Sequence, residues 1–193
     1  MGSRIMHYAM GTVLCRKYSF DNDFLVGSIA PDVNKNSHTP KKLTHFIHSQ
    51  KGTNTIVPQD FIDEYSWAMT DFQLGYYLHL VSDDVWLNTV FDKYIRKNTS
   101  YPKEELQRIY YHDFEILNKI LIDKYNLKKL SFDKYMVSNV KEIQDKDLEY
   151  LVDDLNNDFD EQVTGDLQLF KVAEIYQYID DSAAKFEDLY FPF

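Results

Sequence analysis

The sequence predicts a single all-α domain over residues 1–193. Glycine occurs 6 times and proline 5 times in the chain, which favours long uninterrupted helices over turn-rich β structure. Apolar residues recur at helical spacing along most of the sequence. A length of 193 residues suits one domain with one core, and no repeat, linker or low-complexity tract divides the chain.

The first half of the chain is expected to contain two helical stretches joined by an irregular one. Residues 4–17 place their apolar side chains on adjacent rows of a helix. Residues 18–44 are expected to be irregular, because turn residues and a stretch rich in Asn, Lys, Ser and Pro interrupt them. Pro58 precedes a long helical pattern over about residues 59–97, with room for one break.

The second half is expected to be helical as well. One helix begins near Pro102, with two glutamates in its first turn, and runs to about Tyr125. From Ser131, a suitable N-cap, apolar residues again keep helical spacing. A final helix is expected over about residues 165–187.

The charge balance and the cysteine count exclude several functions. The chain carries 21 Lys and Arg against 31 Asp and Glu, a formal net charge of −10, which argues against binding to a nucleic acid or an anionic membrane. Cys15 is the only cysteine, which excludes a disulfide framework and a cysteine-cluster metal site. Residues 1–7 lack the features of a secretory signal, and no apolar run approaches the about 18 residues of a membrane span. We therefore expect a cytoplasmic chain.

The sharpest local pattern joins His79 and Asp83. The two residues are four positions apart, so on a helix both side chains project from one face, one turn apart. A neutral imidazole and a carboxylate at that spacing can converge on one divalent ion. Gly75, one turn earlier in the same row, has no side chain and could let an ion or a substrate approach the helix. The alternative is a His–Asp pair whose members bond only to each other.

Further candidate ligands lie in the same part of the chain. All 6 histidines fall within the first 112 residues, which suggests chemistry in the N-terminal part and packing in the C-terminal part. Asp32 follows an apolar run and a proline, and His45 comes thirteen residues later. His7 lies on the inward row of the first helix, and His112 lies on or beside the apolar stripe of the helix that begins near Pro102.

In their order and approximate spacing these motifs resemble the zinc-dependent phospholipase C family, whose wider relatives include single-strand-specific nucleases. The resemblance covers residues 5–125 and is carried by Met6-His7-Tyr8-Ala9, Gly27 to Asp32, Thr44-His45-Phe46, Leu74 to Asp83, and Tyr111-His112. It implies an all-helical domain that holds three zinc ions and hydrolyses phosphoester bonds.

The resemblance also implies a role for each candidate residue. One complete zinc site would consist of Asp32, His45, His79 and Asp83. Asp83 would in addition bridge toward the ion held by His7, and His112 would be one ligand of the remaining ion. Asp32, at the rim of the site, could accept the proton of a metal-bound water as a general base. One to three Zn²⁺ ions are expected, and Mn²⁺ or Fe²⁺ also suit imidazole and carboxylate ligands.

Three features depart from the family pattern. The family's enzymes expose an N-terminal tryptophan whose amine helps to bind one ion, whereas this chain begins with Met1. Thr89 stands where the family has a further histidine. Ile116 stands where the family has a glutamate, and the nearest carboxylates are those of Asp113 and Glu115.

Two main hypotheses of function follow. The first is a metal-dependent phosphoester hydrolase of the phosphodiesterase type, which acts through a metal-activated water on a small phosphoester or a phospholipid-derived substrate. The alternative is a non-catalytic helical metal-binding or interaction domain derived from the same family, and a third class is a helical structural protein whose histidines only pack. In the first two cases residues 1–125 hold the metal site between helices, and residues 131–193 supply packing helices.

Overall fold

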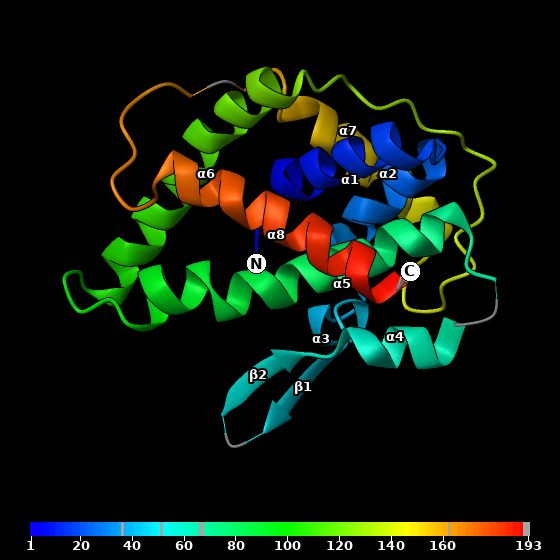
Figure 1. Cartoon of the computed structure of the whole chain (residues 1–193), viewed down its shortest axis with the longest axis horizontal. Helices are drawn as coiled ribbons and strands as arrows, with labels where there is room; N and C mark the ends of the chain where they lie inside the picture. The colour runs from blue at the N-terminus through cyan, green and yellow to red at the C-terminus, as the bar shows by residue number, and fades with distance from the viewer. Residues whose placement is uncertain (36, 51, 66–67, 162, 191–193) are drawn as a thin grey trace.

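The computed structural model describes residues 1–35, 37–50, 52–65, 68–161 and 163–190. These residues are mostly helical, with a small β-hairpin, which confirms the predicted all-α class (Figure 1). The α-helices are α1 (Arg4–Tyr18), α2 (Asn22–Ile29), α3 (Lys41–Thr44), α4 (Pro58–Tyr65), α5 (Asp71–Asn88), α6 (Lys103–Tyr125), α7 (Leu148–Asn157) and α8 (Val172–Tyr190). The other elements are the 3₁₀ helices η1 (Ala30–Lys35) and η3 (Asp145–Asp147), the π-helical segment η2 (Asp92–Arg96), and the strands β1 (Ile47–Gln50) and β2 (Thr53–Ile56).

Helix α5 forms the centre of the fold. It is buried along most of its length, and its apolar side chains share one core with those of α1, α2, α7 and α8. Helix α2 crosses it so closely that a Cβ at Gly75 would lie 2.1 Å from the backbone oxygen of Phe24. A Cβ at Gly27 would lie 2.1 Å from the backbone oxygen of Phe72. The expectation that Gly75 leaves room for an ion or a substrate is therefore wrong, because the backbone of α2 fills that space.

The predictions for α1 and α6 are confirmed to within one or two residues. Ser3 caps α1, because its side chain accepts the Met6 amide proton in a capping box. Helix α6 begins directly after Pro102 and ends before Asn126, which adopts the left-handed conformation common at helix C-termini (φ 48°). The sequences of both helices combine suitable residues at the helix ends with apolar periodicity between them, and together these two features indicate a helix.

The expectation of an irregular chain over residues 18–44 is wrong. Helix α2 begins after Asp21, whose side chain accepts the amide proton of Asp23 at 2.8 Å. Helices η1 and α3 follow in the same stretch. Helix α2 carries no clear amphipathic period, because it is short and buried between α1 and α5, and a helix that is apolar all round gives little periodic signal.

The β-hairpin formed by β1 and β2 was not expected from the sequence. Its strands pair antiparallel, with Ile47 opposite Ile56 and Gln50 opposite Thr53. Gly52 lies in the turn with a φ of 80°, a conformation that glycine adopts without strain. The hairpin extends away from the helices, beside α3 and α4 (Figure 1).

The long helical pattern expected over residues 59–97 is divided twice in the structure. Helix α4 ends at Tyr65, and α5 begins after Thr70 with a second capping box, in which Thr70 and Gln73 bond to each other's backbone amides. After Asn88 the chain leaves α5 and forms η2. A strong N-cap inside an apolar pattern therefore marks a helix start that periodicity alone misses.

The expectation of a helix from Ser131 is also wrong, because regular helix begins only at η3 and α7. Asp133 accepts the amide proton of Tyr135 at 2.9 Å, and Asn139 adopts a positive φ of 52°. Short polar side chains that bond to nearby backbone in this way compete with helix formation. The chain runs around the helices as a long irregular segment before it reaches Leu148 (Figure 1).

The last helix starts at Val172 rather than near residue 165. The reason is Asp113 on α6, whose buried carboxylate accepts the amide protons of residues 168–170 at 2.8–3.0 Å. Those amides are therefore held by a side chain and cannot join a helix.

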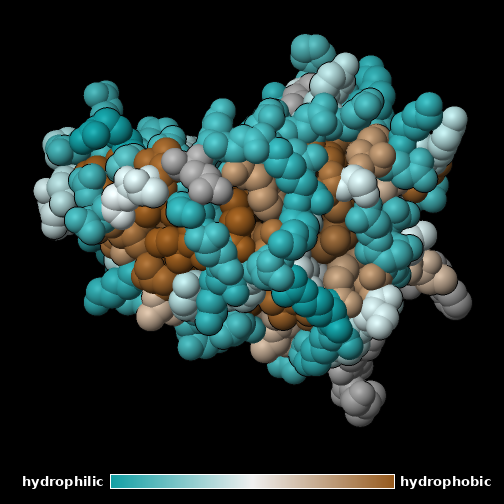
Figure 2. All heavy atoms as spheres, turned by 90° about the horizontal axis from the view of Figure 1, so that it is seen from above, coloured by the Kyte–Doolittle hydropathy of each residue, from teal (hydrophilic) through white to brown (hydrophobic). Residues whose placement is uncertain are grey.

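The surface mixes hydrophilic ridges with apolar side chains in the hollows between them, as Figure 2 shows for one face. Several large apolar groups are exposed, including Tyr135, Val137 and Tyr150. Within the described ranges, no helix combines the length and the apolar character needed to cross a bilayer.

Candidate metal centre

Five of the six predicted ligands lie together in the interior of the protein. His7 comes from α1, Asp32 from η1, His45 from the C-cap of α3, and His79 and Asp83 from successive turns of α5. Each of these side chains is at most 4% exposed. The packing of α1, η1 and α3 around α5 is what brings them together.

Two of the imidazoles have a tautomer that the surrounding hydrogen bonds define. His79 Nδ1 lies 2.9 Å from the backbone oxygen of Ser28, which can only accept, so Nδ1 carries the proton. His7 Nδ1 lies 2.9 Å from Ser82 Oγ, and Ser82 donates its own proton to the backbone oxygen of His79 at 2.8 Å. Ser82 Oγ must therefore accept from His7, and in both rings the unprotonated nitrogen is Nε2.

The same reasoning applies to His45. Its Nδ1 lies 2.8 Å from Thr44 Oγ1, and that hydroxyl donates to the backbone oxygen of Lys41 at 3.3 Å. Thr44 therefore accepts from His45, and Nε2 again carries the lone pair. Hydrogen bonds that hold Nδ1–H on the outer side and leave Nε2 bare are typical of metal-binding histidines.

The bare nitrogens face carboxylate oxygens at distances that suit a shared ion. Nε2 of all three imidazoles and Oδ2 of Asp83 are buried and have no hydrogen-bond partner among the described residues. The distances from Nε2 to Asp83 Oδ2 are 3.5 Å for His79 and 3.7 Å for His45, and from His45 Nε2 to Asp32 Oδ1 3.5 Å. Such distances are long for hydrogen bonds, whereas two ligands about 2.1 Å from a tetrahedral ion lie about 3.4 Å apart. The donor set therefore fits a divalent cation.

Asp83 presents its two oxygens to different partners. Oδ1 lies 3.4 Å from His7 Nε2 and accepts the Gly2 amide proton at 3.3 Å, while Oδ2 faces His45 and His79. Two overlapping groups of three ligand atoms result, each within 4.8 Å: His7, Asp32 and His79, and His45, His79 and Asp83. This arrangement offers coordination to one ion or to two that share ligands.

Burial favours the neutral form of His7 and His45. Burial first, and then the neighbouring His79 ring, stacked on His7 at 3.8 Å, lower the pKa of His7 from 6.5 to about 4. Burial also lowers the pKa of His45. Neutral imidazoles do not have to lose a proton before they bind a metal.

The structure does not bring His112 to this cluster. Its side chain is 40% exposed on α6, and its Nδ1 lies 3.5 Å from Glu115. Asp113 is bound to the amides of residues 168–170, so it does not replace the family's glutamate, and Ile116 is a buried apolar side chain. Thr89 donates its hydroxyl proton to the backbone oxygen of Val85. The ligands of a third ion are therefore not assembled within the described part of the chain.

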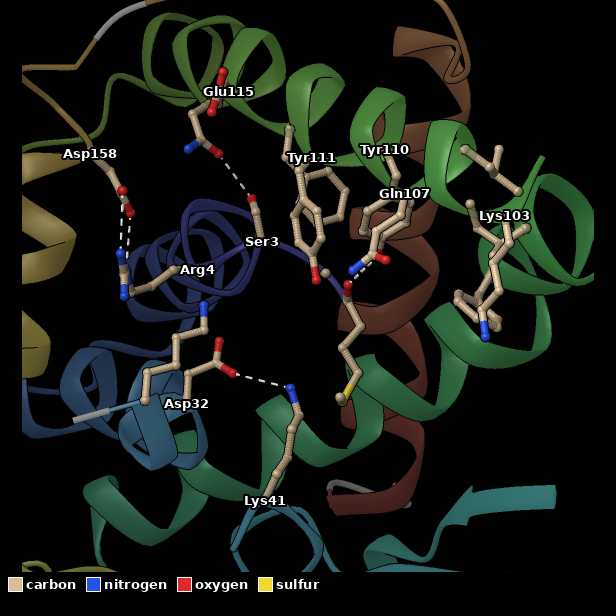
Figure 3. Close-up of a pocket in the computed structure, with 18 residues that line it drawn as sticks. Ser3, Arg4, Asp32, Lys41, Lys103, Gln107, Tyr110, Tyr111, Glu115 and Asp158 are labelled. Atoms are coloured by element: carbon tan, nitrogen blue, oxygen red, sulfur yellow. Dashed lines mark hydrogen bonds and ion pairs between the residues drawn. The ribbon is translucent and has the colours of Figure 1, made fainter. Parts of the chain in front are cut away.

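A cavity of about 670 Å³ adjoins the cluster. Asp32 lines it on the cluster side, close to Lys41, and Tyr110 and Tyr111 extend into it from α6 on the opposite side (Figure 3). The Tyr110 hydroxyl donates to the backbone oxygen of Met1 at 2.7 Å, which fixes the start of the chain against the cavity wall. Asp32 thus connects the buried ligands to a space large enough for a small molecule.

Some functional groups were not predicted from the sequence. Ser28, Thr44 and Ser82 orient the three imidazoles, and Lys41 lies at the open side of the cluster. The sequence held a signal for two of them: Thr44 directly precedes His45, and Ser82 lies three residues after His79 on the same helix.

Comparison with protein-family models, with curated proteins and with solved structures returns no match to this chain.

Proposed function

We propose that this protein is a divalent-metal-dependent phosphoester hydrolase similar to the zinc-dependent phospholipase C family. The observation that carries the proposal is the convergence of three unprotonated Nε2 atoms and one bare carboxylate oxygen in a buried space beside a cavity. Buried polar atoms without partners are costly and rare in folded proteins. One or two bound cations would satisfy these atoms.

The chemistry of the donors supports Zn²⁺, with Mn²⁺ or Fe²⁺ as further candidates. A divalent ion bound there lowers the pKa of its water from 15.7 toward about 7 and polarises a phosphoryl oxygen. His7, His45 and His79 would supply nitrogen ligands, and Asp83 would supply an oxygen to the group with His45 and His79. Ser28, Thr44 and Ser82 would hold the imidazoles in the orientation that binding requires.

Asp32 is the residue we assign to proton transfer. Its carboxylate is 4% exposed and lines the cavity, so it borders both the ligands and the space where a substrate would lie. From this position it would accept a proton from the attacking water and release it to the departing alcohol. It would also be a ligand, in the group with His7 and His79.

The proposed substrate is a small phosphoester. The cavity volume of about 670 Å³ falls in the range of pockets that bind small molecules. The net charge of −10 disfavours a polyanionic nucleic acid. A phospholipid-derived phosphoester remains within this proposal.

Metal analysis and hydrolysis assays on purified protein test the proposal. We expect at least one equivalent of Zn, Mn or Fe by elemental analysis, and metal-dependent hydrolysis of p-nitrophenyl phosphate, bis-p-nitrophenyl phosphate or p-nitrophenyl phosphorylcholine. Both properties should be lost in Asp83→Asn and His79→Ala. His48→Ala is the matched control, because His48 is half-exposed on β1 and paired with Asp60. Turnover retained in both cluster variants would refute the proposed site.

A non-catalytic metal-binding domain is the second candidate. It is favoured by Thr89 and Ile116 at positions where the family has ligands, and by the distance of His112 from the cluster. In that case metal would bind with the same dependence on Asp83, but no phosphoester would be hydrolysed. The two assays together separate the candidates.

A further inference from the structure

The cavity beside the metal cluster carries two ammonium groups at the end where Asp32 lies. Lys41 Nζ lies 3.7 Å from Asp32 Oδ1, and that same oxygen lies 3.5 Å from His45 Nε2. The Lys41 side chain is 34% exposed, so it reaches the cavity from the open side of the cluster (Figure 3). At 3.7 Å the ion pair is too long for a hydrogen bond, and the three ammonium protons can reach an additional anion.

Lys35 is the second of these groups. It lines the same cavity and lies three residues after Asp32 on η1. Residues three apart on a 3₁₀ helix project in the same direction, so Lys35 and Asp32 share one side of η1. Two lysines therefore flank the point where the cavity meets the cluster, in a chain whose net charge is −10.

The other charged side chains around the cavity face a protein partner or lie elsewhere. Arg4 binds Asp158 at 3.0 Å, and Glu115 lies 3.5 Å from His112. Lys103, at the first residue of α6, lies on the far side of the tyrosines from Asp32 (Figure 3). The cationic side chains next to the cluster are therefore Lys35 and Lys41, beside the carboxylate of Asp32.

The opposite wall is aromatic. Tyr111 is 55% exposed and packs edge-to-face on Tyr110, with ring centroids 5.3 Å apart. Phe114 continues this surface along α6. An exposed aromatic wall in a concave site suits a flat aromatic or apolar group.

We propose that the cavity selects phosphate monoesters of aromatic or apolar alcohols. A monoester carries close to two negative charges at neutral pH, because its second pKa is about 6, whereas a diester carries one. Lys41 and Lys35 would bind the non-bridging oxygens of the dianion next to the cluster, and Tyr110 and Tyr111 would contact the alcohol part. This inference rests on the proposed function and names the substrate class of the same site.

The reaction balances without a further reactant. The oxygen of water forms a bond to phosphorus as the bond between phosphorus and the alcohol oxygen breaks. The proton that Asp32 takes from water is transferred to the departing alkoxide. The products are the free alcohol and inorganic phosphate.

Binding measurements test the charge preference without turnover. Phenyl phosphate and diphenyl phosphate are titrated by calorimetry into wild type, Lys41→Gln and Lys42→Gln, each as isolated and after chelation. We expect phenyl phosphate to bind wild type about tenfold more tightly than diphenyl phosphate, and Lys41→Gln to weaken it by about tenfold, the usual effect of one charge-assisted hydrogen bond. Lys42→Gln is the matched control, because Lys42 is exposed and lines a different groove. Equal binding of both esters, or equal effects of the two variants, would overturn the proposal.

Hydrolysis assays separate this inference from the proposed function. We expect a higher kcat/KM for p-nitrophenyl phosphate than for bis-p-nitrophenyl phosphate, and a loss of this preference in Lys41→Gln. Hydrolysis of the diester alone would support the proposed function and overturn the monoester assignment. Binding of phenyl phosphate that depends on Lys41, without hydrolysis of either ester, would support the charge preference and refute the hydrolase.

Discussion

Asp83 and Asp113 are both fully buried carboxylates on long helices, yet their surroundings are opposite. Asp113 accepts three backbone amide protons and holds the segment before α8 against α6. Asp83 accepts one long hydrogen bond from Gly2 and turns its other oxygen toward two unprotonated imidazole nitrogens. Burial alone therefore does not mark a functional carboxylate. A buried carboxylate whose acceptor sites are filled stabilises the fold, and one whose neighbours are also acceptors suits a bound cation.

The largest expected effect is on metal binding. Asp83→Asn should lower the affinity for Zn²⁺ by more than about 1,000-fold, beyond the 10–100-fold cost of losing a group that only orients a ligand. The reason is that a neutral amide replaces the carboxylate whose Oδ2 faces His45 and His79 and whose Oδ1 faces His7. Competition with a chromogenic chelator measures the change. An affinity equal to that of wild type would remove Asp83 from the site.

The matching experiment on Asp113 concerns stability. Asp113→Ala should lower the free energy of unfolding by about 4 kcal/mol, because one buried and two part-buried backbone amides lose their acceptor at about 1–3 kcal/mol each. Asp113→Asn keeps one acceptor oxygen and should cost less. In chelator-treated protein, Asp83→Asn should not destabilise, since it removes a buried charge next to bare nitrogens. Urea unfolding of the three variants tests the contrast, and equal losses at both positions would contradict it.

These two carboxylates also show how far the sequence could predict the site. The four-residue spacing predicted that His79 and Asp83 share a helix face, and the order of the motifs added His7, Asp32 and His45. The sequence did not indicate that Asp113 bonds to residues 168–170, because that contact depends on how a distant segment packs on α6. The sequence also did not indicate that His112 lies away from the cluster, because the direction of its side chain depends on how α6 packs.

The secondary structure was likewise predicted from the sequence only in part. Helices α1 and α6 were predicted because capping residues and periodicity agree there. Helix α2 and the hairpin were missed, since α2 is apolar on all sides and the hairpin strands are only four residues long. The close crossing at Gly27 and Gly75 could not be read from spacing, because it depends on two helices meeting.

The pH dependence of stability sharpens the comparison further. The pKa of His7 is about 4 in the folded protein and about 6.5 in an unfolded chain. Unfolding therefore takes up a proton at pH values between these two, and the metal-free protein should lose about 1.4 kcal/mol per pH unit from His7 as pH falls from about 6.5 to 4. His7→Gln should remove this part of the slope. Chelator-treated protein unfolded in urea at several pH values provides the measurement, and an unchanged slope in the variant would contradict the assignment.

The smallest expected effect concerns the residues that orient the imidazoles. Ser82→Ala removes the acceptor for His7 Nδ1–H and should weaken Zn²⁺ binding by about tenfold, the lower end for such supporting groups. Thr89→Val is the matched control: it removes a hydroxyl on the same helix that bonds only to backbone. The same chelator competition measures both variants. Equal affinities for the two would show that Ser82 does not orient a ligand.

A crystal structure of zinc-loaded protein, with anomalous data at the zinc edge, tests the central claim most directly. We expect an anomalous peak about 2.0–2.2 Å from His79 Nε2 and Asp83 Oδ2, with Nδ1 of His79 still bonded to the backbone oxygen of Ser28. A peak only at the exposed pair of His48 and Asp60, or His79 rotated so that Nε2 bonds to protein, would contradict it.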